Sequence, residues 1–170
     1  MKNTTKKLAI TAMLIAIDVI FTRPLAINTS LMKIGLGFTA EVLSAMLFGP
    51  WWAAITAAMA DLLGSLIFPT GAYFPGFTVT AAITGIIFGL MLYKRETSWN
   101  NSIFTAFLNC FIVSLAANTL MISFVFGAPF KPLLVTRLIQ FAVMLPVQAI
   151  VIRLLGSSKA VEVIRKTALS

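Results

Sequence analysis

The stretch IFTAFLNCFIVSLAANTLMISFVF, residues 103–126, runs for 24 residues without a charged side chain. A helix needs about 20 mostly apolar residues to cross the hydrocarbon core of a bilayer, so this stretch predicts a membrane-spanning helix. Five more apolar runs flank it, over roughly residues 8–26, 31–48, 51–68, 77–93 and 133–155. The sequence therefore predicts an all-α membrane protein, a bundle of six transmembrane helices.

The composition supports a membrane protein over a soluble one. Of the 170 residues, 59% are hydrophobic and 11% are charged, whereas soluble domains have about 45–50% apolar and about 25% charged residues. We expect one integral membrane domain over residues 1–170. The amino terminus does not fit a cleaved signal peptide, because Asp18 and Arg23 interrupt its apolar stretch.

The residue inventory argues against an enzyme. The chain has one cysteine, Cys110, and no histidine, which excludes a disulfide framework and histidine-dependent nucleophilic catalysis. A zinc or haem site is not expected either. No P-loop is present, so any ATP hydrolysis must occur in a partner. We expect no catalytic residue, no metal and no cofactor.

The net charge of +8 follows a membrane pattern, because the basic residues stand at the ends of apolar runs rather than in a stripe for nucleic acid. With a cytoplasmic amino terminus, nine cations lie inside and four outside, which predicts that both termini are cytoplasmic. The inside set is Lys2, Lys6, Lys7, Lys94, Arg95, Arg153, Lys159, Arg165 and Lys166, and the outside set is Arg23, Lys33, Lys131 and Arg137.

Several polar side chains interrupt the apolar runs, and most map to the outer half. Such residues are costly in lipid and usually face the bundle interior, so we expect them to surround an outward-facing substrate pocket. Alternatively, they pair only with one another, for example Asp61 with Arg137. The set comprises Asp18, Asp61, Asn118, Arg137 and Gln140, with Glu41 near the middle.

The outer loop FPTGAYFPGFT, residues 68–78, alternates aromatic residues with residues that fix turns. Its rings predict a platform on which a flat ligand stacks, formed by Tyr73, Phe74 or Phe77. The alternative is a belt of aromatic residues at the lipid headgroups.

The cations that break the positive-inside pattern favour an anionic ligand. Arg23 suits bidentate contact with a carboxylate, and Lys33 and Lys131 stand in the neighbouring loops. The alternative for both lysines is that they snorkel to lipid headgroups.

Small residues recur at helical spacing in the first run, at Ala9, Ala12 and Ala16. The pair Ala12 and Ala16 lets another helix approach closely, either within this chain or on a partner. Asn109 and Gln148, nearer the inner side, are candidates for interhelical hydrogen bonds.

Together these features resemble the substrate-binding S components of energy-coupling factor (ECF) vitamin transporters. The loop over residues 68–78 looks like the signature loop of the folate-specific members, and the segment Thr136-Arg137-Leu138-Ile139 is similar to theirs. The resemblance implies a subunit of the bacterial plasma membrane that captures folate, or a related pterin, outside. It also implies a transmembrane coupling subunit, on which Ala12 and Ala16 dock, and two cytoplasmic ATPases.

A folate ligand would suit the polar and aromatic residues of the outer half. Asp61, Asn118 and Gln140 are expected at the pterin edge, the three loop rings with Thr78 at the flat rings, and Arg23 and Arg137 at acidic or pterin oxygens. Two alternatives stay open. One is an S component for another anionic or aromatic vitamin. The other is a stand-alone proton-coupled carrier that uses Asp18, Glu41 and Asp61.

Overall fold

The computed structural model describes residues 2–24, 26–28, 33–69, 73–95, 97–127 and 130–157. Most of them are helical, apart from short connections and two paired antiparallel strands of two residues each, which we call the hairpin. In chain order, the elements are α1 (Lys2–Thr22), β1 (Ile27–Asn28), β2 (Lys33–Ile34), α2 (Phe38–Phe48), α3 (Pro50–Ile67), α4 (Pro75–Leu92), α5 (Trp99–Leu108), the π-helix η1 (Asn109–Ala117), α6 (Asn118–Phe126) and α7 (Phe130–Ser157).

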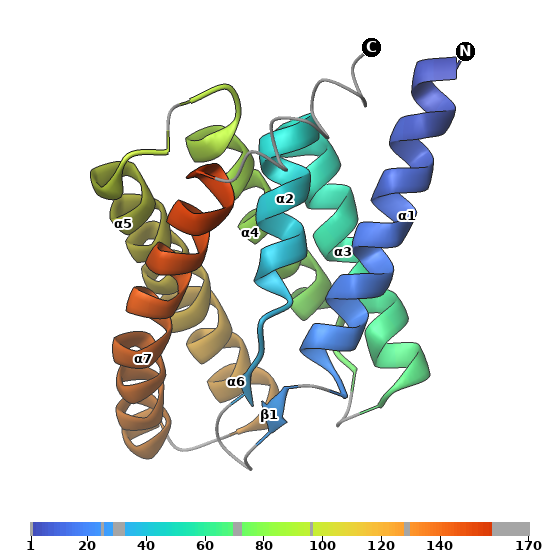
Figure 1. Ribbon diagram of the computed structural model, residues 1–170. Helices are drawn as coiled ribbons and strands as arrows, with labels where there is room; N and C mark the ends of the chain where they lie inside the picture. Colours follow the sequence, from blue (N-terminus) through green and yellow to red (C-terminus); the bar gives the residue numbers. More distant parts are fainter. Residues whose placement is uncertain are drawn as a thin grey trace.

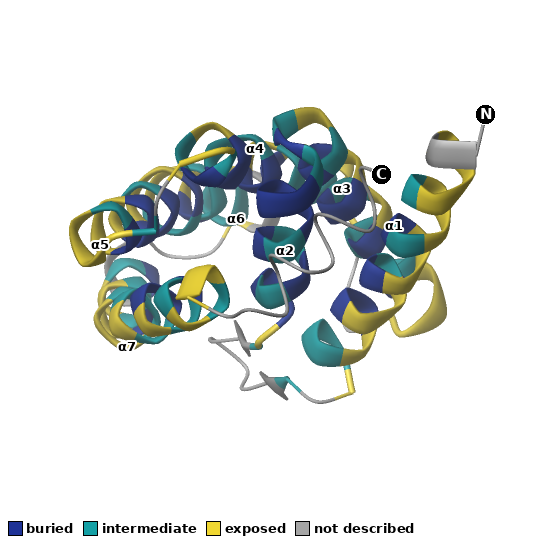
Figure 2. Ribbon diagram, turned by 45° about the horizontal axis from the view of Figure 1, so that its top comes forward, coloured by how far each residue is buried: buried dark blue, intermediate teal, exposed yellow. Residues whose placement is uncertain are grey.

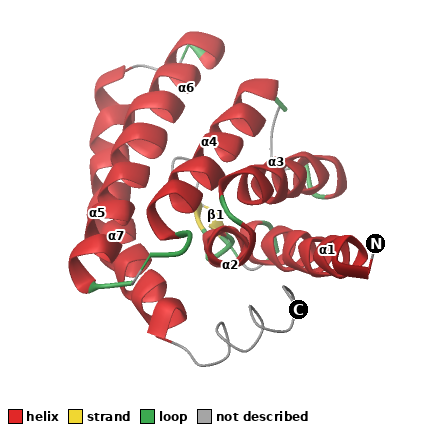
Figure 3. Ribbon diagram, turned by 90° about the horizontal axis from the view of Figure 1, so that it is seen from above, coloured by secondary structure: helices red, strands yellow, loops and turns green. Residues whose placement is uncertain are grey.

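These elements form six helical rods, because α5, η1 and α6 follow one another without a break. In Figure 1 the first turn of α1 and the last turn of α7 lie at the same end of the bundle, and the hairpin lies at the opposite end. Seen from above, α2 stands inside, with α1 and α3 on one side and α5 and α7 on the other (Figure 3). The predicted six-helix bundle is confirmed.

Four of the rods are long and apolar enough to span a bilayer: Pro50–Ile67, Pro75–Leu92, Trp99–Phe124 and Leu133–Ser157. The α1 helix has the required length, but its first turns carry Lys2, Lys6 and Lys7.

The expectation of a full second span over residues 31–48 was wrong. The α2 helix has 11 residues, or about 16 Å, and β2 and residues 35–37 precede it. Non-helical backbone at membrane depth is tolerated where it lines a cavity, and Gly35 and Gly37 do so.

The distribution of side chains is that of a protein solvated by lipid. Large apolar side chains such as Met13, Leu66 and Phe124 are exposed. In Figure 2 the exposed, yellow parts of the helices face outward from the bundle. Polar side chains are buried between helices, for example the hydroxyls of Ser44 and Thr56, which lie 2.8 Å apart between α2 and α3. The bundle therefore keeps its hydrogen-bonding groups away from lipid.

The closest helix contact joins α3 to α4 through small residues. A Cβ atom at Gly85 would overlap the backbone of Ala53, and one at Gly89 would overlap Pro50. Small residues let backbones approach and gain van der Waals contact, which drives helix association in lipid. This contact anchors the part of the bundle that carries Asp61 and Thr80.

The core lies at the end of the bundle where α1 begins, and its buried apolar side chains come from α2, α3, α4, α5 and α7. The members are Phe38, Val42, Ala45, Met46, Ala53, Phe88, Leu92, Ala106, Ala149 and Ile152. Beyond it, toward the hairpin, polar side chains replace apolar ones.

Candidate ligand-binding site

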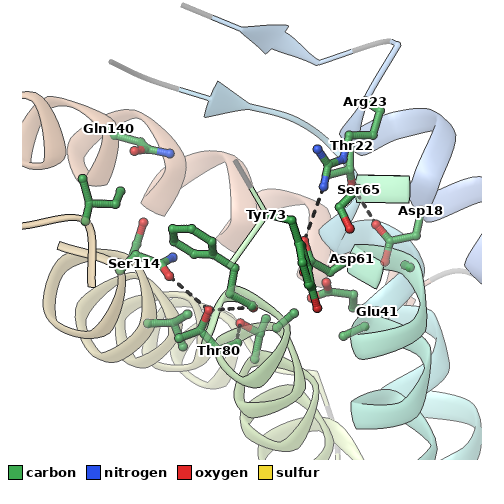
Figure 4. A pocket seen from close by; sticks show the side chains of 18 of the residues that line it. Asp18, Thr22, Arg23, Glu41, Asp61, Ser65, Tyr73, Thr80, Ser114 and Gln140 are labelled. Carbon is green, nitrogen blue, oxygen red and sulfur yellow. Dashed lines mark hydrogen bonds and ion pairs between the residues drawn. The ribbon is translucent and has the colours of Figure 1, made fainter. Parts of the chain in front are cut away.

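A cavity of about 470 Å³ opens in the hairpin half of the bundle. Its volume falls within the range of about 300–1,000 Å³ that is common for small-molecule sites. In Figure 4, Gln140 and Ser114 lie across the cavity from Asp18, Glu41 and Asp61. The lining residues are Asp18, Thr22, Arg23, Glu41, Ala57, Ala60, Asp61, Ser65, Tyr73, Phe77, Thr80, Ala81, Thr84, Val113, Ser114, Asn118, Ile122, Arg137 and Gln140.

A chain of polar contacts joins the end of α1 to the aromatic loop. Arg23 Nη2 lies 3.5 Å from Asp61 Oδ1, and Arg23 Nη1 donates to the carbonyl of Phe68 at 3.4 Å. Thr78 Oγ1 donates to Asp61 Oδ2 at 2.8 Å and lies 2.9 Å from the Tyr73 hydroxyl. The chain holds α1, α3 and the start of α4 together on one side of the cavity.

The opposite wall comes from α4, α7 and the middle of the long α5–η1–α6 rod. Arg137 Nη1 donates to Gln140 Oε1 at 2.7 Å, three residues along α7. Thr80 Oγ1 donates to Asn118 Oδ1 at 3.0 Å. The π-helix supplies Ser114 and ends just before Asn118. Because π-helical segments often occur at functional sites, this wall combines an unusual backbone with polar side chains.

Three carboxylates face this cavity beside two guanidinium groups. Asp18 Oδ1 accepts a hydrogen bond of 2.7 Å from Thr22, and Asp61 is paired with Arg23. Glu41 lies in the first turn of α2, close enough to Asp18 and Asp61 for electrostatic interaction. Its Oε2 atom is buried and has no hydrogen-bond partner among the described residues.

A second, smaller cavity of about 220 Å³ adjoins the first. The two share Glu41, Ser114 and Gln140 among their lining residues. In the smaller one, Asn109 Nδ2 donates to Gln148 Oε1 at 3.2 Å. The expected interhelical hydrogen bond of Asn109 and Gln148 is thus present, and it lies between η1 and α7.

The structure brings together most of the predicted site residues. Seven of the nine line the larger cavity: Arg23, Asp61, Tyr73, Phe77, Asn118, Arg137 and Gln140. The other two stand behind it. Thr78 bridges Tyr73 and Asp61, and the Phe74 ring meets that of Phe77 edge-on at 6.1 Å between centroids.

The alternative in which Asp61 pairs with Arg137 was wrong. Asp61 pairs with Arg23 instead, because the last turn of α1 lies beside α3, whereas Arg137 on α7 donates to Gln140. The side chains of Lys33 and Lys131 lie outside the described residues.

Sequence reasoning did not single out the small hydroxyl residues of the wall. Thr22, Ser65, Thr80, Thr84 and Ser114 all line the cavity. The available signal was their position on the same apolar runs as the selected residues, at helical spacing from Asp18, Asp61 and Asn118. Serine and threonine are common within membrane helices, so the residue type alone does not distinguish them.

The alanines of α1 do not face the cavity. Ala9, Ala12 and Ala16 are exposed, as are Met13 and Ile17 beside them. The alternative in which Ala12 and Ala16 pack inside this chain therefore lacks support, and the small residues lie on an outward face of the bundle.

An all-helical bundle with lipid-facing apolar surfaces and an internal polar cavity defines a multi-pass membrane protein of the kind that holds a small molecule. The family model of the ECF-type riboflavin transporter S component matches residues 2–158. The chain thus belongs to the ECF-type S component family, which consists of transport subunits rather than enzymes.

The similar proteins are named for folate, whereas the family model is named for riboflavin. The folate transporter FolT of Clostridium novyi is 40% identical over 141 residues, which cover 83% of this chain and 82% of the relative. FolT of Leuconostoc mesenteroides is 29% identical over 86% of this chain and 82% of the relative. A crystal structure of FolT bound with folic acid matches with a TM-score of 0.85 and 37% identity, over 90% of this chain and 95% of that one.

Proposed function

We propose that this protein is a single-domain, high-affinity folate-binding subunit of the bacterial cell membrane. It captures the vitamin, or a related pterin, outside and delivers it inward with an ATP-driven ECF complex. The observation that carries the proposal is the cavity, which places aromatic, cationic and acidic side chains around one space of about 470 Å³. Similarity to FolT over most of the chain supports folate as the ligand.

The chemistry of folate suits this lining. Tyr73 and Phe77 offer flat rings to the pterin and benzoate groups, and such stacking contributes about 1–3 kcal/mol per ring elsewhere. Arg23 and Arg137 are suited to the carboxylates of the glutamate tail. Asp61, Asn118 and Gln140 supply polar groups for the pterin edge, while Phe74 and Thr78 support Tyr73 and Phe77 from behind.

The proposed orientation places the cavity toward the exterior. The connection between α4 and α5, which contains Lys94 and Arg95, lies at the same end as the start of α1, opposite the hairpin (Figure 1). The positive-inside rule then assigns that end to the cytoplasm. On the cytoplasmic side, two ATPase subunits supply the energy through a transmembrane coupling subunit. The exposed face of α1 that contains Ala12 and Ala16 docks on this coupling subunit.

Calorimetric titration of the detergent-purified protein tests the ligand. Folic acid should bind with a dissociation constant in the nanomolar range without ATP, whereas thiamin should not bind. Riboflavin, the vitamin in the name of the matching family model, is the second candidate and belongs in the same experiment. Binding of riboflavin but not folic acid by folded protein would replace the proposed ligand.

Uptake in liposomes tests the coupling. The purified chain alone, with a pH gradient, should not accumulate folate, whereas the complex with coupling and ATPase subunits should do so when ATP is present. Uptake by the chain alone would instead support the proton-coupled carrier.

A further inference from the structure

Glu41 is a cavity acid with a buried oxygen that accepts no hydrogen bond from the described residues. It lines both the larger and the smaller cavity, so it stands where the two meet. Its Oε2 atom is buried and lacks a hydrogen-bond partner among the described residues. A buried carboxylate oxygen left without a donor costs free energy, so a donor from a bound ligand would offset that cost.

The other acceptors predicted for the pterin edge are already engaged within the protein. Asp61 accepts from Thr78 and pairs with Arg23. The side-chain oxygen of Asn118 accepts from Thr80, and that of Gln140 accepts a short bond from a guanidinium. Among the acids of the larger cavity, Asp18 and Asp61 each accept a hydrogen bond from a threonine hydroxyl, whereas a buried oxygen of Glu41 has no hydrogen-bond partner in the described part of the chain.

The charges of the cavity point to a ligand that has donors as well as acids. Three carboxylates, of Asp18, Glu41 and Asp61, face two guanidinium groups, of Arg23 and Arg137. A purely anionic ligand would be repelled by a carboxylate that no cation neutralises. A ligand with a neutral donor edge at one end and carboxylates at the other avoids that repulsion.

The 2-amino-4-oxopyrimidine ring of a pterin has such an edge. Its 2-amino group and the adjacent ring N3–H point the same way, and a carboxylate accepts two parallel hydrogen bonds from donors so arranged. We propose that Glu41 is the specificity-determining residue that accepts these two bonds. The proposal rests on the proposed function, since it assigns a role within the folate site.

A comparison of two ligands on two proteins tests the pairing. Folic acid and its 2-desamino analogue, in which hydrogen replaces the amino group, are titrated against the parent protein and Glu41→Gln. The parent should prefer folic acid by about 10-fold or more, because a hydrogen bond to a charged group is worth about 1.5–3 kcal/mol. In Glu41→Gln that preference should fall to about threefold or less.

Asp18→Asn is the matched acid-to-amide control. Asp18 lines the same cavity and accepts a hydrogen bond from Thr22, so this change should affect both ligands by a similar factor and leave the preference for folic acid in place. If Glu41→Gln does not fold, Glu41→Asp, which retracts the same carboxylate by one methylene, should lose the preference as well.

The possible failures can be told apart. A parent protein that does not bind folic acid overturns the proposed function itself. A parent that binds folic acid but does not discriminate against the desamino analogue overturns the role of Glu41 alone. The same holds if Glu41→Gln keeps the parent's preference.

Discussion

Arg23 connects three parts of the cavity wall through one side chain. It directly follows α1, pairs with Asp61 on α3 and donates to the carbonyl of Phe68, where the aromatic loop begins. A Cβ atom at Gly64 would lie 3.0 Å from Arg23 Nε, so the glycine leaves room for the guanidinium. Arg23 thus positions Asp61 and also lines the cavity.

Replacing the arginines should weaken folate binding far more than replacing a loop lysine. Arg23→Ala and Arg137→Ala should each raise the dissociation constant by about 10- to 100-fold, because each removes a charged donor worth about 1.5–3 kcal/mol. Lys33→Ala should change it little. Titration calorimetry in detergent measures all three.

Arg95→Ala is the matched control for these variants, since Arg95 is exposed and belongs to the connection between α4 and α5, which lies at the end opposite the hairpin (Figure 1). It should bind like the parent protein. If the two cavity variants also bind like the parent, the cations that hold the ligand lie elsewhere.

At the scale of elements, the short α2 and the π-helical η1 shape the cavity. The α2 helix begins at Phe38, so Gly35 and Gly37 line the smaller cavity with bare backbone. In η1 the nine residues from Asn109 to Ala117 are wound more widely than an α-helix. Thr119 Oγ1 reaches the carbonyl of Ser114, five residues earlier, at 3.4 Å. These departures from regular α-helix both occur beside the cavity.

The α3–α4 contact should be intolerant of added volume. In Gly89→Ala the new methyl group would overlap the Pro50 backbone, and overpacking of this kind costs about 1–3 kcal/mol. The variant should melt at a lower temperature in detergent, whereas Leu90→Ala, at an exposed neighbouring position, should melt close to the parent. An unchanged melting temperature for Gly89→Ala would show that the helices do not pack this closely.

The exposed alanine face of α1 should serve transport and not binding. Ala12→Trp should leave folate affinity unchanged, because Ala12 points away from the cavity, but should block uptake by the complete complex. Ala142→Trp adds the same ring at an exposed alanine of α7 and should spare both activities. Normal transport by Ala12→Trp in liposomes would remove the docking assignment.

At the scale of the whole molecule, the cavity and the basic residues at the start of α1 lie toward opposite ends. Arg153, near the end of α7, donates to the carbonyl of Thr97, just before α5. This contact ties two rods together at the end where α1 begins. The cavity and its polar side chains lie in the half of the bundle nearer the hairpin. This one-sided position fits a protein that receives its ligand from one side of the membrane.

Labelling in intact bacteria tests that orientation. A membrane-impermeant maleimide should react with Pro69→Cys, an exposed position just after α3, and should reach Ser98→Cys only after permeabilisation. The native Cys110 is buried, so background labelling should be low. The opposite labelling pattern would place both termini outside.

The sequence determined the class of the protein, and it singled out seven residues that line the larger cavity. Long uncharged runs predict membrane helices because lipid leaves backbone groups no other partner, and costly polar residues within them predict a polar interior. The pattern of apolar runs gave the number of rods correctly and located Arg23, Asp61 and Tyr73 near one end.

Only the tertiary structure decided which groups meet. Apolar periodicity cannot show that residues 33–37 lie outside the helix, since a strand and glycine backbone can occupy an apolar stretch as well as a helix can. Nor can it assign partners among charges on different helices, because pairing depends on how the rods rotate and cross. For this reason Asp61 meets Arg23 rather than Arg137, and a buried oxygen of Glu41 has no hydrogen-bond partner among the described residues.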